Sequence, residues 1–105
     1  MREICLARLD RTRPVLVLTR EAARAAMTKV TVAPITSTIK GLSGEVPVGR
    51  ANGLDHAGAV SLDNVVTIPA ALLGRTIGFL GADQERELAR AITLAYDLEV
   101  PLLGD

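Results

Sequence analysis

The chain has 105 residues, 49% of them hydrophobic, and a formal net charge of zero. This length predicts one domain with a single core over residues 1–105. Phe79 and Tyr96 are the only aromatic residues, so aromatic platforms for stacking bases are not expected. The single cysteine excludes an internal disulfide. Since no stretch has the ~20 apolar residues of a membrane span, we expect a cytoplasmic protein with no membrane partner.

The zero net charge conceals an uneven distribution along the chain. Residues 1–50 contain nine Lys and Arg against four acidic residues, and residues 51–105 carry an equal acidic surplus. Ten of the twelve basic residues are arginine, whose planar guanidinium binds phosphate through two hydrogen bonds. The pattern favours a local anion-binding site, although most single arginines are expected to be solvated surface charges.

The chain begins with two predicted strands. Weak alternation of apolar residues predicts the first strand over residues 3–9, and residues 10–12 have the composition of a turn. Residues 13–19, Arg-Pro-Val-Leu-Val-Leu-Thr, predict a strand that is buried on both faces. Pro14 favours an extended conformation of the residue before it, so Arg13 is presented from a stiff backbone where the strand begins.

A short helix and a third strand follow. The Ala-rich residues 20–27 favour a short helix or a helical turn, for which Thr19 could serve as the N-cap. Residues 29–36 are rich in β-branched side chains and predict a strand. Pro34 lacks an N–H group, so it indicates an edge strand or a bulge at this point.

Glycines interrupt the middle of the chain. They leave room for one short strand at residues 45–48 and otherwise predict a loop. Residues 58–68 predict a further strand or a bent pair of strands that ends at Pro69. Residues 75–81 add one more strand.

The clearest element is a C-terminal helix over residues 83–98. Acidic residues favour its positive N-terminal end, and Pro101 prevents much extension. Four apolar residues fall on one face of this helix: Leu88, Ala91, Ile92 and Ala95. Short strands, glycine turns and two helices predict a mainly β fold of the α+β class, a small and strongly bent barrel-like sheet with helices packed outside.

Metal and cofactor chemistry have little support in the sequence. His56 and Cys5 lie far apart and form no ligand cluster. His56 could be a general base, but a surface histidine in a loop is the more common case, and Cys5 is expected to be a buried thiol rather than a nucleophile. Residues 41–44 lack the lysine and the spacing of a phosphate-binding loop. We therefore expect no metal and no cofactor.

The remaining candidates are a cation and a group of hydroxyls. Arg13 begins the buried strand, and Thr36, Ser37 and Thr38 end the next long strand. A guanidinium and a hydroxyl can hold a phosphodiester and stabilise the added charge of a pentavalent transition state. The sequence therefore indicates a site that acts on a phosphodiester.

Several segments, in this order and spacing, resemble the MazF/PemK toxins. They are Arg-Pro-Val-Leu-Val-Leu-Thr at 13–19, Val-Ala-Pro-Ile-Thr-Ser at 32–37 and Ser-Leu-Asp-Asn-Val-Val-Thr-Ile at 61–68. The resemblance continues through Leu-Gly-Arg-Thr-Ile-Gly at 73–78 and the C-terminal helix. Each motif alone is loose, but together they cover nearly the whole chain.

The resemblance implies a small SH3-like barrel that forms a homodimer. It implies a sequence-specific, metal-independent endoribonuclease toxin that arrests growth by cleaving single-stranded RNA, with messenger RNA as the expected substrate and ribosomal or transfer RNA as the alternatives. A MazE-like antitoxin would neutralise the toxin, and only their complex would bind operator DNA. The family's catalytic arginine and threonine correspond to Arg13 and Thr36. The 2′-hydroxyl of the RNA would attack, leaving a 2′,3′-cyclic phosphate and a 5′-hydroxyl end.

The sequence departs from the family pattern near its start. The loop between the first two strands is shorter than in many members, and Arg2 replaces the usual glycine before the first strand. Substrate gating and base recognition are therefore expected to differ. We expect RNA contacts from two loops, made by Arg11, Thr12, Ser37, Thr38 and Lys40.

Three alternatives remain open at this stage. Arg13 could form a plain surface ion pair with Asp10 or Glu45, and Thr36 could be an ordinary hydroxyl at a strand end. A CcdB-like protein would share the barrel and the dimer but bind DNA gyrase without hydrolysis, which the pairing of Arg13 with Thr36 disfavours. An inactive barrel would only bind the antitoxin.

Overall fold

The computed structural model describes residues 1–99 of the chain. The predicted strands all form, and residues 58–68 prove to be a bent pair of strands joined by a short 3-10 turn. The elements, in chain order, are β1 (Glu3–Arg8), β2 (Thr12–Val17), α1 (Glu21–Arg24), β3 (Lys29–Thr36), β4 (Glu45–Val48), β5 (Gly58–Ser61), β6 (Val66–Pro69), β7 (Leu73–Phe79) and α2 (Ala82–Ala95).

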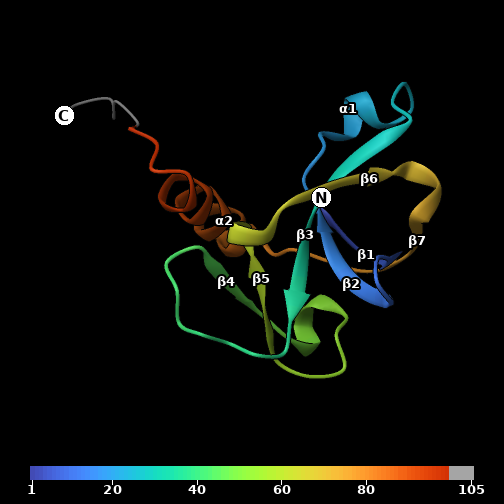
Figure 1. Ribbon diagram of the computed structural model, residues 1–105. Helices are drawn as coiled ribbons and strands as arrows, with labels where there is room; N and C mark the ends of the chain where they lie inside the picture. Colours follow the sequence, from blue (N-terminus) through green and yellow to red (C-terminus); the bar gives the residue numbers. More distant parts are fainter. Residues whose placement is uncertain (100–105) are drawn as a thin grey trace.

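The strands form one curled antiparallel sheet in the order β4-β5-β3-β2-β1-β7, with β6 pairing to β3. Figure 1 shows the sheet bending around on itself, with α2 packed outside it near β4 and β5. The mainly β, barrel-like fold predicted from the sequence is confirmed. This curvature brings the β1–β2 turn and the end of β3 toward the same region of the molecule.

Strand β2 lies between two hydrophobic clusters. Val15, Leu16 and Val17 are each at most 2% exposed. Leu16 packs in the cluster that α2 covers, whereas Val15 and Val17 pack on the other face together with Cys5. Burial of each such side chain stabilises the fold by about 1.5–3 kcal/mol. The predictions of a strand buried on both faces and of a buried thiol are both confirmed.

Strand β3 is an interior strand, so the edge position predicted from Pro34 is wrong. On one side β3 pairs with β2, where Pro34 lies opposite Val15. On the other side it pairs with β6 as far as Val32 and with β5 from Ile35 onward. Pro34 lies where β3 changes partners, and a residue without an N–H group disturbs neither of these two ladders there.

The first helix is little more than one turn, the shorter of the two forms predicted for residues 20–27. Helix α1 covers Glu21–Arg24 and has no buried residue, and without tertiary packing the Ala-rich sequence alone does not sustain a longer helix. Its N-cap is Arg20 rather than Thr19. The Thr19 hydroxyl instead accepts a hydrogen bond of 2.8 Å from the backbone N–H of Thr31, so it ties the end of β2 to β3.

Helix α2 confirms the predicted amphipathic face. Leu88 and Ala91 are 2% exposed, and Ile92 and Ala95 pack against the same cluster. The helix ends at Ala95, while the predicted stop at Pro101 lies outside the described residues. Within residues 1–99 no helix is long and apolar enough to cross a membrane.

Candidate active site

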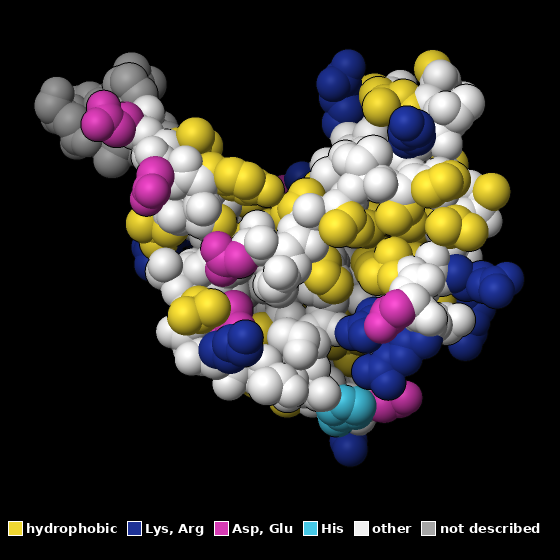
Figure 2. Space-filling model, viewed as in Figure 1, with side chains coloured by type: hydrophobic (Ala, Val, Ile, Leu, Met, Phe, Trp, Pro, Cys, Tyr) yellow, Lys and Arg dark blue, Asp and Glu magenta, His cyan; other side chains and the backbone are white. Residues whose placement is uncertain are grey.

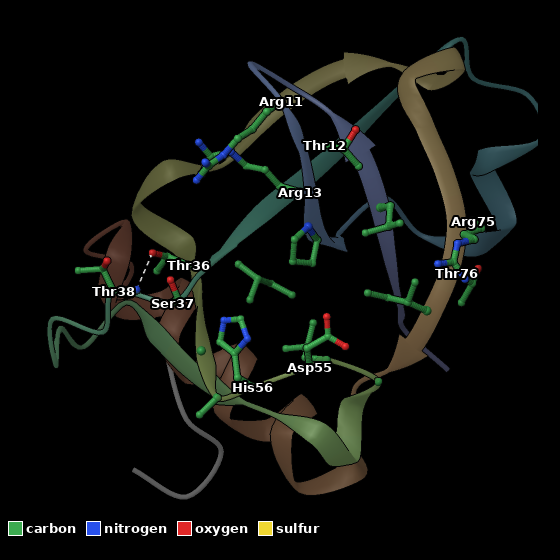
Figure 3. Close-up of a pocket in the computed structure, with 18 residues that line it drawn as sticks. Arg11, Thr12, Arg13, Thr36, Ser37, Thr38, Asp55, His56, Arg75 and Thr76 are labelled. Carbon is green, nitrogen blue, oxygen red and sulfur yellow. Dashed lines mark hydrogen bonds between the residues drawn. The ribbon is translucent and has the colours of Figure 1, made fainter.

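A cleft of roughly 830 Å³ lies at one end of the curled sheet. Its walls come from the β1–β2 turn, the end of β3, the loop before β5 and the middle of β7. Figure 3 shows Arg11 and Arg13 on one side of this cleft, with Thr36, Ser37 and Thr38 at the end of β3. The cation and the hydroxyls that the sequence singled out therefore line one cavity.

Asp10 holds the guanidinium of Arg13 in a defined plane. Arg13 donates from Nε to Asp10 Oδ1 at 2.9 Å and from Nη2 to Asp10 Oδ2 at 2.8 Å. Asp10 Oδ1 also accepts the backbone N–H of Arg11 at 3.0 Å, which fixes the carboxylate in the short turn. A guanidinium has five N–H groups, so both Nη1 protons and one Nη2 proton of Arg13 remain for a phosphate.

This ion pair shifts both titrations toward the charged forms. The hydrogen bond from Arg13 lowers the pKa of Asp10 to about 2, aided by the backbone hydrogen bond from Arg11. Asp10 in turn raises the pKa of Arg13, chiefly through the same hydrogen bond. Arg13 is therefore a permanent cation, suited to donate hydrogen bonds and unsuited to accept a proton.

The ion pair predicted as an alternative for Arg13 is present with Asp10 and not with Glu45. Glu45 instead accepts backbone N–H groups from the β3–β4 loop, at 3.2 Å from Lys40, 2.8 Å from Gly41 and 3.1 Å from Leu42. The Asp10 pair uses only one edge of the guanidinium of Arg13. It is therefore compatible with phosphate binding at the opposite edge.

Thr36 has a hydroxyl proton to give. Its Oγ1 accepts the backbone N–H of Thr38 at 3.0 Å, so the O–H bond can point elsewhere as a donor. Thr36 lies opposite Ala59 in the β3–β5 ladder. A Cβ on Gly58 would come within 2.7 Å of the Thr36 carbonyl oxygen, and this close backbone approach fixes the position of Thr36.

Four of the five residues predicted to contact RNA line the cleft, namely Arg11, Thr12, Ser37 and Thr38. Lys40 does not line it, and its backbone N–H is bound by Glu45. After Thr38 the chain leaves the cleft, and the next backbone N–H groups donate hydrogen bonds to the Glu45 carboxylate. The prediction of a contact from Lys40 finds no support in this geometry.

The cleft also contains residues that the sequence did not mark as RNA contacts. Asp55 and His56 approach from the loop before β5, and Arg75 and Thr76 from β7. No local motif distinguishes these side chains from surface residues. The sequence had offered His56 only as a possible general base, and strand pairing brings these residues to the cleft: β5 pairs with β3, and β7 with β1.

A pair of hydrogen-bonded amides, the buried Asn52 and the half-buried Gln84, supports this wall of the cleft. Asn52, 4% exposed, donates to the carbonyl of Phe79 at 3.0 Å and to Gln84 Oε1 at 2.7 Å, and accepts from Gly49 N at 3.0 Å. Gln84 Nε2 donates back to Asn52 Oδ1 at 3.1 Å and to the carbonyl of Pro47 at 3.1 Å. The loop before β5 is therefore anchored to β7 and to the start of α2.

Comparisons with known proteins agree with this fold and identify the family. The family model described as PemK-like, MazF-like toxin of type II toxin-antitoxin system matches residues 3–96. The endoribonuclease MazF3 of Mycobacterium tuberculosis is 57% identical over 99 residues, which cover 94% of this chain and 96% of that protein. The solved Mycobacterium tuberculosis toxin MazF-mt6 has a TM-score of 0.92 at 55% identity, covering 93% of this chain and 99% of that one.

A more distant structure shares the fold. An endoribonuclease from a mycobacterial species, solved in complex with its cognate antitoxin, has a TM-score of 0.84 at 22% identity and covers 94% of this chain and 95% of that one. The match to the family model and the identity to MazF3 both extend over nearly the whole chain. The chain belongs to the PemK-like, MazF-like toxins of type II toxin–antitoxin systems.

Proposed function

We propose that Arg13 and Thr36 are the catalytic pair with which this endoribonuclease toxin cleaves RNA. The observation that carries the proposal is the position of both side chains in one cleft, each with hydrogen-bond donors left over. Three N–H groups of Arg13 and the O–H of Thr36 are available to phosphate oxygens. A phosphodiester held between them would receive charge-assisted hydrogen bonds from two directions.

The reaction follows from what these groups can supply. The 2′-hydroxyl of the substrate lies beside the scissile phosphorus, so the protein needs mainly to align it and to stabilise charge. Attack by the 2′-oxygen expels the 5′-oxygen and leaves a 2′,3′-cyclic phosphate. Arg13 balances the charge that develops on the phosphate, and Thr36 holds one of its oxygens. The cation of Arg13 takes the place that a metal ion has in other nucleases.

Single-stranded RNA would run through the cleft past both loops. Arg11 and Thr12 lie on the Arg13 side, whereas Ser37 and Thr38 lie on the Thr36 side. Arg75 extends the basic lining to β7. These polar side chains can bind splayed bases and the backbone, in keeping with the way proteins select RNA sequences.

The working assembly is a homodimer that a MazE-like antitoxin neutralises, and we expect operator DNA to be bound only by the complex of the two. Large apolar side chains remain exposed on the isolated chain, including Phe79 at 43% and Leu94 at 48%. Figure 2 shows extended hydrophobic areas on the visible face. Two-fold pairing is the common way to cover such surface. The site of action is the cytoplasm, where RNA substrates are found.

The proposal is tested by cleavage of a long transcript of defined sequence in the presence of EDTA. The wild type is expected to cut at discrete positions and leave a 2′,3′-cyclic phosphate and a 5′-hydroxyl. Arg13→Ala and the near-isosteric Thr36→Val should each lose roughly a hundred- to a thousand-fold in rate, whereas Thr36→Ser should retain most activity. Wild-type cutting by purified, folded Arg13→Ala would show that the assignment is wrong.

The attacking nucleophile is tested separately. A short RNA that spans a mapped cut, with a 2′-deoxy nucleotide on the 5′ side of that cut, should bind but remain intact. Persistent cleavage of this substrate would mean that activated water attacks instead.

A further inference from the structure

The proposed pair leaves one proton without an acceptor. Attack by the 2′-hydroxyl requires that its proton be removed as the new O–P bond forms. Arg13 is a cation whose pKa is raised by Asp10, and the hydroxyl of Thr36 is a weak base. Neither group can take the proton, so the cleft must offer another acceptor.

His56 lies at the right end of the cleft to do so. In the antiparallel β3–β5 ladder Thr36 lies opposite Ala59, and Gly58 packs against the Thr36 carbonyl. Continued outward, this register sets His56 beside the residues that follow Thr36. Figure 3 shows the imidazole projecting toward the Thr36–Ser37 side of the cleft, across from the guanidinium of Arg13.

The loop that carries His56 is held in place while the ring itself is not. Arg50 Nε donates to the carbonyl of Asp55 at 3.1 Å, and the Asn52 amide ties the preceding turn to β7. Among the hydrogen bonds within residues 1–99, the imidazole of His56 takes part in none, and the side chain is exposed. Because His56 lines the cleft and its ring is exposed, the imidazole is accessible to a substrate bound there.

We propose that His56 is the general base that removes the proton from the attacking 2′-hydroxyl, an inference that rests on the proposed site of Arg13 and Thr36. The 2′-oxygen gives its proton to an imidazole nitrogen and forms a bond to phosphorus, the bond from phosphorus to the 5′-oxygen breaks, and the 5′-oxygen takes a proton from water. The imidazolium then returns its proton to solvent, so the step balances. Histidine is the side chain that most often performs this transfer near neutral pH.

The other charged groups in and beside the cleft are less suited to accept this proton. Asp10 is bound to Arg13, which lowers its pKa to about 2 and makes it a very weak base. Arg11, Arg13 and Arg75 are cations, which donate hydrogen bonds and do not accept a proton. Asp55 adjoins His56 and offers the one competing carboxylate in the cleft-lining residues with no ion pair. The experiment must therefore distinguish His56 from Asp55 as the acceptor of the proton.

The experiment measures single-turnover cleavage of a short RNA that spans a mapped cut, from pH 5 to 9, with the wild type and three variants. The wild-type rate should rise with pH and level off as the imidazole becomes neutral. His56→Gln should lose roughly a hundred- to ten-thousand-fold at neutral pH and lose this rise. Added imidazole should restore part of the activity of His56→Ala but not of His56→Gln. Asp55→Asn should keep the rise with pH.

Binding of the 2′-deoxy RNA and thermal unfolding serve as controls for structure. Both should change little in His56→Gln, because the ring makes no hydrogen bond in the fold. If His56→Gln cuts at the wild-type rate with the wild-type pH profile while Arg13→Ala is inactive, the role of His56 is wrong and the Arg13–Thr36 site stands. If Asp55→Asn alone removes the rise, Asp55 is the base. If Arg13→Ala is also fully active, the site itself is wrong.

Discussion

Asp10 and Arg13 form a bidentate ion pair at 2.8 and 2.9 Å that leaves the outer edge of the guanidinium uncovered. The carboxylate acts as an orienting group, because it fixes the plane in which Arg13 meets a phosphate. The pair also places a negative charge near the RNA-binding surface. Asp10 should therefore favour catalysis, because it orients Arg13, and weaken RNA binding, because it is negatively charged.

Asp10→Asn should lower kcat while RNA binding becomes tighter at low salt. Loss of the bidentate geometry misplaces Arg13, which we expect to cost roughly ten- to a hundred-fold in kcat. Removal of the negative charge strengthens the attraction of the cleft for phosphate. Single-turnover cleavage and titration with 2′-deoxy RNA separate the two effects.

The chain offers a matched control for this variant. Asp83 pairs with Arg86 at the same i,i+3 spacing, at 3.5 Å, on the exposed start of α2 away from the cleft. Asp83→Asn should leave both kcat and binding unchanged. Equal effects of the two substitutions would show that Asp10 acts only through net charge.

The same ion pair makes stability depend on acid pH. Because the folded-state pKa of Asp10, about 2, lies below the ordinary aspartate value of about 3.9, the carboxylate stabilises the folded state above pH ~4. This contribution is lost as the pH falls through 2. The urea midpoints of wild type and Asp10→Asn should therefore differ by a constant amount near neutral pH and converge toward pH 2. The difference will be small because the pair is exposed. A gap that widens on acidification would contradict the assigned direction of the shift.

Hydrophobic pattern explains why much of the fold could be predicted. The run Val15–Val17 has no polar residue, so only a strand covered on both faces accommodates it. The apolar face of α2 could be predicted equally well, since Leu88 and Ala91 are spaced so that they lie on one side of a helix. Errors arose where tertiary context decides, as at Pro34, whose missing N–H is tolerated because β3 changes partners there.

Only some of the residues of the candidate site could be predicted from the sequence. Arg13 and Thr36 stand in motifs next to clear strands, and both line the cleft. Asp55, His56 and Arg75 are brought there by the register of β5 and β7, which depends on pairing between distant segments. The RNA contact predicted for Lys40 stays a prediction, because Lys40 does not line the cleft and Glu45 binds only its backbone N–H.

Gly53 should tolerate a side chain far less well than Gly41, although both have positive φ. The values are +87° and +76°, so alanine at either position costs about 1–2 kcal/mol in backbone strain. A Cβ at Gly53 would also collide with the carbonyl oxygen of Ile77 on β7, whereas one at Gly41 would meet nothing within 4 Å. Urea unfolding should give a loss of about 1 kcal/mol for Gly41→Ala and about 3 kcal/mol or more for Gly53→Ala. Equal losses would mean that the close approach of the loop to β7 is absent.

The amide pair of Asn52 and Gln84 should couple stability to activity. Asn52→Ala leaves the Gly49 N–H and the Phe79 carbonyl without this partner in a buried site, so we expect a loss of about 3 kcal/mol in the free energy of unfolding. Gln84→Ala should cost less, because Gln84 is only half-buried. The double variant should fall short of the sum by about 1–2 kcal/mol, since both substitutions break the same contacts.

Loosening this pair should also slow cleavage by releasing the loop that carries His56. Under conditions where Asn52→Ala is still folded, hydrogen exchange at residues 54–57 should accelerate, and kcat should fall about ten-fold or more as the loop loses its fixed position. Thr67→Ala provides the control, because it removes only the exposed 2.9 Å hydrogen bond to Thr31 and should change stability by less than about 0.5 kcal/mol with no effect on cleavage. Accelerated exchange without a loss of kcat would show that the position of this loop does not matter for catalysis, and it would remove the link between the buried amides and the cleft.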